Sequence, residues 1–78
     1  MIENIVMENK ERLKNLGINI KVNRLKANLS QEELSERTNI ARNSISLIET
    51  GKINPTILKV IDIAKTLNVK VEDLIKNS

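Results

Sequence analysis

Glycine and proline are almost missing from this sequence. Within 78 residues they occur only at Gly17, Gly51 and Pro55. Strands are joined by tight turns that depend on these residues, so a β-rich fold is disfavoured. Apolar residues instead recur at helical spacing along most of the chain. We therefore predict an all-α fold with short connections in a single domain, because domains usually span about 50–250 residues.

Several residue types are absent, and each absence excludes a class of function. Without cysteine there is no disulfide, thiolate zinc site or cysteine nucleophile. Without histidine the commonest general base and metal ligand are missing, so an enzyme is the least favoured class and no metal or cofactor is expected. Without aromatic rings no side chain can stack on an unpaired base, which argues against single-stranded nucleic acids.

The hydropathy pattern is that of a protein in aqueous solution. No apolar run approaches the roughly 18 residues of a membrane span, and no signal-peptide pattern opens the chain. We expect a soluble, cytoplasmic protein that binds neither a membrane nor a small-molecule ligand.

The net charge of +3 is unevenly distributed. Residues 1–9 carry −2, residues 10–52 carry +4, and residues 53–78 carry +1. A basic middle segment suits a polyanionic partner, although a solvated surface of ordinary composition would look the same.

The periodicity of apolar residues predicts five helices. Residues 1–16 form either a frayed N-terminal arm or an upstream extension of the first helix, and the globular domain is expected over residues 17–78. In the first helix the inward stripe is expected at Leu13, Leu16, Ile20 and Ala27. The predicted helices span about 10–27, 31–38, 42–50, 57–67 and 71–76.

Local signals mark the ends of these helices. Ser30 and Glu33 form a capping box, in which each side chain accepts a hydrogen bond from the other residue's backbone amide. Thr56 stands at the N-cap position of the fourth helix, as Ser30 does for the second, and its hydroxyl can cap that helix. Residues that tolerate left-handed backbone follow the first three helices, at Asn28, Asn39 and Gly51.

The second and third helices are short and are separated only by residues 39–41. Helices joined this closely must cross at a steep angle, as in the helix-turn-helix motif that binds DNA. An ordinary helical corner in a small all-α domain has the same spacing, so spacing alone leaves both interpretations open. The apolar residues that would fill the shared core are Leu34, Ile40, Ile45 and Ile48.

The sequence of this region resembles a known family. Residues 30–52 read SQEELSERTNIARNSISLIETGK, followed by NPT at 54–56, IAKTLNV at 63–69 and EDLI at 72–75. Over residues 17–78 this pattern is similar to the Cro/repressor-type helix-turn-helix family, also called the xenobiotic-response-element family. The resemblance implies a compact lambda-repressor-like bundle of five helices, with the third helix as the recognition helix in the DNA major groove.

Four positions depart from the family pattern. A hydrophobe is usual where Asn23 stands, alanine where Ser35 stands, glycine where Asn39 stands, and a Ser or Thr cap where Ala41 stands. Asn39 is a mild change because asparagine tolerates a positive φ. The Ser35 hydroxyl needs a hydrogen-bond partner if it is buried. Asn23 and Ala41 are expected to lower stability or to shift the recognition helix slightly.

The resemblance implies that bases are contacted from the start of the recognition helix. Arg42 can bridge guanine O6 and N7, and Asn43 can bridge adenine N6 and N7. The alternative for both is a first-turn surface residue that contacts only phosphate or water. Leu47 is expected to face outward, either against a thymine methyl or as a solitary exposed apolar residue. The predicted base-contacting residues are Ala41, Arg42, Asn43, Ser46 and Leu47.

Phosphate contacts are implied around this helix. Gln31 begins the second helix, whose N-terminus suits an anion, and Lys52 would add salt-dependent affinity. The alternative for Gln31 is that it is only a neighbour of the capping box, and the alternative for Lys52 is that it is a solvated lysine without a DNA contact. The predicted phosphate-contacting residues are Ser30, Gln31, Ser44, Thr50, Lys52 and Asn54.

Glu49 is an acid on a helix that would approach a polyanion, so it requires a partner. The resemblance implies Arg24 on the first helix. We expect a structural ion pair that is exposed to solvent and orients the phosphate-facing surface, with a contribution of about 0–1 kcal/mol.

A single helix in one groove contacts only a few base pairs, so we predict a homodimer that binds two half-sites. An apolar excess in the fourth and fifth helices marks the candidate dimer interface, although these residues could equally form the core. They are Val60, Ile63, Val69, Val71 and Ile75.

The function that fits these observations is a sequence-specific regulator of transcription that binds double-stranded DNA, acting as a repressor in a prokaryote or phage. Restriction-modification controllers, and antitoxins that repress their own operon, are similar small proteins. The same fold can also act as a protein-interaction module without specific DNA binding.

Overall fold

The computed structural model describes the backbone of residues 2–78 and the side chains of residues 9–78. Five helices and no strand occur in this part of the chain, which confirms the predicted all-α fold. The helices are α1 (Ile2–Lys26), α2 (Gln31–Thr38), α3 (Arg42–Glu49), α4 (Ile57–Leu67) and α5 (Val71–Ile75).

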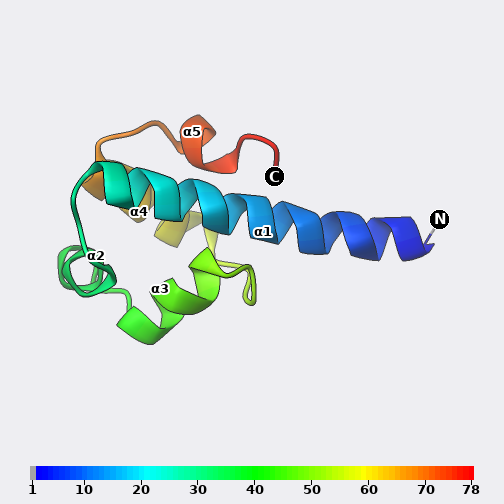
Figure 1. Cartoon of the computed structure of the whole chain (residues 1–78), viewed down its shortest axis with the longest axis horizontal. Helices are drawn as coiled ribbons and strands as arrows, with labels where there is room; N and C mark the ends of the chain where they lie inside the picture. Colours follow the sequence, from blue (N-terminus) through cyan, green and yellow to red (C-terminus); the bar gives the residue numbers. More distant parts are fainter. Residues whose placement is uncertain (1) are drawn as a thin grey trace.

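The longest helix, α1, is the axis around which the others are arranged. In Figure 1, α5 lies along one side of α1, α3 lies along the other, and α4 passes behind it. The N-terminal part of α1 extends past the other four helices. The helix begins at Ile2 rather than near residue 10, so residues 2–16 continue into α1 without a break. That residues 17–78 form a separate domain stays a prediction.

An aliphatic core holds the five helices together. Because no ring is available to fill space, the core consists of leucine, isoleucine, valine and alanine side chains that touch one another between the helices. The helix-turn-helix contributes all four residues predicted for its shared core. The buried residues are Leu16, Ile20, Leu29, Leu34, Ile40, Ile45, Ile48, Val60, Ile63, Ala64, Leu67 and Leu74.

The predicted helix ends are present. The capping box is complete, since the Glu33 amide donates to the Ser30 hydroxyl at 3.0 Å and the Ser30 amide donates to the Glu33 carboxylate at 2.9 Å. The Lys59 amide donates to the Thr56 hydroxyl at 3.3 Å, which caps α4. Positive φ angles follow the first four helices, at Asn28, Asn39, Gly51 and Asn68.

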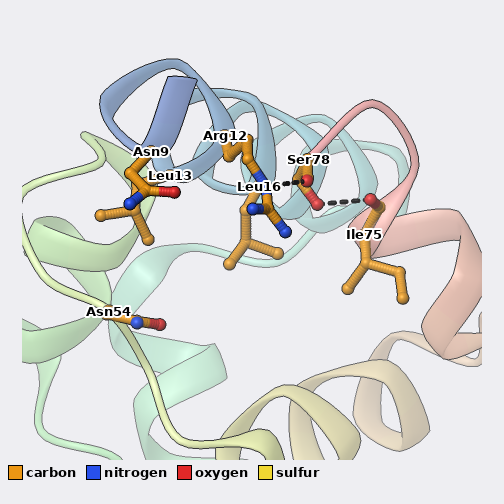
Figure 2. Close-up of a pocket in the computed structure, with 7 residues that line it drawn as sticks. All are labelled: Asn9, Arg12, Leu13, Leu16, Asn54, Ile75 and Ser78. Atoms are coloured by element: carbon orange, nitrogen blue, oxygen red, sulfur yellow. Dashed lines mark hydrogen bonds between the residues drawn. The ribbon is translucent and has the colours of Figure 1, made fainter. Parts of the chain in front are cut away.

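Side chains of α1 bind the C-terminal segment. Asn19 donates to the Leu74 carbonyl at 2.9 Å and to the Lys76 carbonyl at 2.8 Å. Further along the helix, Arg12 donates to the Ser78 carbonyl at 2.7 Å, a bond visible in Figure 2. These bonds fix α5 against the side of α1.

Two expectations about apolar residues are wrong. Ala27 lies beyond the end of α1 and is exposed rather than part of the inward stripe. Val60 and Ile63 are buried in the core of the monomer, so they cannot form a dimer interface. Val69 and Val71 are half-buried against the same core, whereas Ile75 is exposed.

Candidate nucleic-acid interface

Side chains hold the turn between α2 and α3. Asn39 ends α2 with φ 58° and ψ 20°, the left-handed conformation. The Ser35 hydroxyl donates to the Ile40 carbonyl at 2.6 Å, which supplies the partner that this hydroxyl needs. Thr38 donates to the Leu34 carbonyl at 2.7 Å and accepts a hydrogen bond from the Ile40 amide at 3.3 Å. Together these bonds set the angle at which α3 leaves the turn.

The start of α3 presents a polar edge to solvent. Ala41, Arg42 and Asn43 are all exposed, and Ala41 makes no side-chain cap. Arg42, Asn43 and Ser46 line a hollow of about 290 Å³, which Gln31 completes from the start of α2. Four of the residues that the sequence singled out for DNA contact therefore lie around one recess.

Three candidates on α3 are less accessible. Ser44, Ser46 and Leu47 are half-buried. Leu47 was expected to face outward, but part of its side chain is covered by the protein. It therefore offers only a fraction of its surface to a thymine methyl.

Some of the predicted phosphate-contacting residues already form hydrogen bonds within the protein, and others are exposed to solvent. The Ser30 hydroxyl accepts a hydrogen bond within the capping box, and the Thr50 hydroxyl donates to the Ser46 carbonyl at 2.9 Å. Lys52 is exposed in the loop after α3.

Asn54 lies elsewhere. Its side chain points into a second hollow, of about 410 Å³, which α1 and the C-terminal segment also line. Figure 2 shows Asn54 in this hollow opposite Arg12 and Ile75. The structure therefore does not bring Asn54 together with the residues around the recess at Gln31.

The predicted pair of Arg24 and Glu49 is present, but it is buried rather than exposed. The two residues are only 6% and 5% accessible. Arg24 donates through Nε to Glu49 Oε2 at 2.7 Å and through Nη2 to Oε1 at 3.0 Å, a bidentate geometry. The hydrogen bond to Glu49 raises the pKa of Arg24 above its ordinary value, against the opposing effect of burial. Arg24 Nη1 also donates to the Leu29 carbonyl at 2.8 Å.

Gln31 joins this buried pair to the surface. Its Nε2 donates to Glu49 Oε1 at 3.1 Å, so the amide is held between the ion pair and the recess. Sequence reasoning missed this bond. No local pattern indicates it, because it depends on how α2 and α3 cross.

The burial of Glu49 changes the charge that α3 presents. The helix contains two charged residues, Arg42 and Glu49. Because Glu49 is buried and paired with Arg24, the charge that α3 exposes is the cationic Arg42. Two acids, Glu32 and Glu33, lie in the first turn of α2, and Glu33 is turned back onto the Ser30 amide.

Two other kinds of site are missing from the described part of the chain. Among those residues, no three acidic side chains gather closely enough to hold a metal ion. None of the described helices is long and apolar enough to cross a membrane.

Comparison with known proteins agrees with this geometry. A family model described as helix-turn-helix matches residues 20–74, so the chain belongs to the helix-turn-helix family. An uncharacterized HTH-type transcriptional regulator of Archaeoglobus fulgidus is 42% identical over 55 residues, which cover 70% of this chain and 78% of that protein. A second such protein from Methanocaldococcus jannaschii is 40% identical over 47 residues, or 60% of this chain and 71% of the relative.

A solved structure has the same fold. The restriction-modification controller protein C.AhdI from Aeromonas hydrophila superimposes with a TM-score of 0.77 over 80% of this chain and 94% of its own, at 24% identity. This confirms the resemblance at the level of the fold.

Proposed function

We propose that this protein is a sequence-specific regulator of transcription that inserts α3 into the major groove of double-stranded DNA. The single observation that carries the proposal is the exposed polar start of α3 beside Gln31, with the only acid of α3 buried and paired. Membership of the helix-turn-helix family and relatives named as transcriptional regulators support it.

Base recognition is assigned to Arg42 and Asn43. Both are exposed and line the recess, so their side chains are available to a base edge. Ala41 offers a methyl group to thymine, Ser46 a hydroxyl, and Leu47 the exposed part of its side chain. Arginine pairs best with guanine and asparagine with adenine, so these two side chains would set the preferred sequence.

Phosphate binding is assigned to both ends of the motif. The N-terminus of α2 directs backbone amides outward at Gln31, where helix geometry favours an anion. On the other side, Lys52 supplies a positive charge close to the end of α3. Ser30 and Ser44 would add hydroxyl contacts, and Thr50 would do so by exchanging its bond to the Ser46 carbonyl for one to a phosphate.

A homodimer would double the length of DNA that is contacted. A two-fold axis would place two copies of α3 about 34–36 Å apart, one helical turn of DNA. Because Val60 and Ile63 belong to the core, the exposed apolar residues of α4 and α5 are the better candidates for this interface: Ile57, Leu58 and Ile75. Such a dimer would act as a repressor by excluding other proteins from the DNA that it occupies.

Selection of bound sites from random duplexes would define the operator. The variant Arg42→Ala/Asn43→Ala should then lose discrimination between operator and random DNA, because each bidentate contact contributes about 1–3 kcal/mol. Competition binding at fixed salt measures this discrimination. Thermal unfolding should be unchanged, since both side chains are exposed.

Arg37→Ala is the matched control. Arg37 is an exposed arginine at the opposite end of α2, so its loss should leave discrimination intact. If no duplex is retained even in dilute salt, or if the double variant discriminates as well as the wild type, the proposal is wrong.

A further inference from the structure

The outer side of α1 carries an apolar stripe that the monomer leaves exposed. Ile18, Val22 and Leu25 are 51%, 42% and 54% accessible. They are spaced four and three residues apart, so they lie on one side of the helix. A solitary exposed aliphatic residue is ordinary, but three aligned residues form a continuous surface.

Among the helices that the structure describes, none covers this stripe. The helix α1 contacts α3, α4 and α5, and Figure 1 shows these beside and behind it, with the outer side of α1 uncovered. Gly17 and Arg24 face α3, and Asn19 binds the C-terminal segment. The stripe lies on the remaining side of the helix, away from the elements that build the recess at Gln31.

Lysines border the stripe on both sides. With 3.6 residues per turn, Lys14 and Lys21 lie along one edge and Lys26 lies on the other. All three are exposed. Among the side chains that the structure describes, the acid near this surface is Glu11, about two turns before Ile18 at the N-terminal end.

We propose that this α1 face, defined by Ile18, Val22 and Leu25 with Lys14, Lys21 and Lys26, binds an acidic amphipathic helix of a partner protein. An apolar seam on the partner would cover the stripe, and acids beside that seam would meet the lysines. A second copy of this stretch fits less well, because it would bring lysines against lysines. The face is separate from α3, so the partner can bind while the protein is on DNA.

A pair of synthetic helices provides the test. Each has about 18 residues, or roughly five turns, with leucines at alternating spacings of three and four. One carries glutamates beside the leucines and the other carries lysines. We expect the glutamate peptide to bind and to shift the backbone NMR signals of α1 around Val22, while the lysine peptide does not bind.

Two variants locate the binding. Val22→Glu should weaken the binding of the glutamate peptide at least tenfold, whereas Lys65→Glu, which places the same acid at an exposed position of α4, should not. Both should keep the wild-type melting temperature. Binding of duplex DNA by Val22→Glu should equal that of the wild type, so this result is independent of the proposed function.

Four outcomes would overturn the proposal. Two of them are that the glutamate peptide fails to bind, or that it shifts NMR signals only in α2 and α3. Equal binding of both peptides would show that the lysines do not select the partner. A dimer mass in solution that Val22→Glu abolishes and Leu58→Glu retains would assign the face to a second copy instead.

Discussion

Gly17 is the residue at which α1 comes closest to α3. A Cβ atom there would lie 2.5 Å from the Ile48 carbonyl oxygen and closer still to that of Glu49. From the sequence, a glycine inside a helix only indicates a weakness of about 1 kcal/mol relative to alanine. The structure shows that this position admits no side chain, because two helix backbones meet there.

We expect Gly17→Ala to lower the free energy of unfolding by about 1–3 kcal/mol, since overpacking outweighs the gain in helix propensity. Urea denaturation measures the change. Lys21→Ala, at an exposed position of the same helix, should stay within about 0.5 kcal/mol of the wild type. A Gly17→Ala protein as stable as the wild type would show that α1 and α3 are less closely packed.

The stability of the fold also depends on the buried ion pair of Arg24 and Glu49. Removing one partner leaves the other charge buried, so Glu49→Ala should cost about 3–5 kcal/mol. The double variant Arg24→Met/Glu49→Leu should regain most of this loss, because no buried charge remains. Denaturant titration of the three proteins tests this, with Glu36→Ala as a control at an exposed acid. A loss in the double variant as large as in Glu49→Ala would contradict the argument.

At the scale of elements, the start of α2 combines a helix cap with the proposed phosphate-binding site. The Ser30 amide donates to the Glu33 carboxylate, and this bond lowers the pKa of Glu33 below its ordinary value. A lowered pKa in the folded protein means that the ionised carboxylate stabilises the fold. This contribution is present above the unfolded pKa of about 4.3 and disappears as the pH falls through the lower folded value.

Glu33→Gln keeps an acceptor for the Ser30 amide but removes the charge. We expect the wild type to be more stable than this variant near neutral pH, and the difference to shrink as the pH falls below about 4.3. Urea denaturation across a series of pH values measures it. A difference that stays constant with pH would show that the charge of Glu33 does not support the cap.

At the scale of the whole molecule, the charge distribution decides how binding to DNA would depend on salt. Each phosphate neutralised by a lysine or arginine contributes about 0.9 to the slope of log affinity against log salt concentration. Lys52 lies in the loop after α3, where it can make such a contact. Lys65 lies in the last turn of α4, which is not part of the helix-turn-helix.

Lys52→Ala should therefore reduce the salt slope by about 0.9, and Lys65→Ala should leave it unchanged. Affinity for one duplex, measured over a range of salt concentrations, gives both slopes. Equal slopes in the wild type and Lys52→Ala would remove Lys52 from the phosphate-binding surface.

The sequence by itself determined the five helices, with four of the five starts as predicted and every end within one residue of its prediction. It did so because caps such as Ser30, left-handed residues such as Asn39, and the apolar period all act within a few residues. It also indicated the residues around the recess, through a family motif that is contiguous in the chain. The sequence left open whether residues 1–16 form an arm or extend the first helix, and the structure shows that residues 2–16 belong to α1.

Only the tertiary structure decided which groups are buried and which of them meet. The burial of Arg24 with Glu49, the bond from Gln31 to that pair, and the need for glycine at position 17 all depend on how helices distant in the chain cross. The same is true of Val60, which the pattern of apolar residues could assign equally to a core or to a dimer surface. Periodicity shows which side of a helix is apolar, but what covers that side is decided by packing between helices.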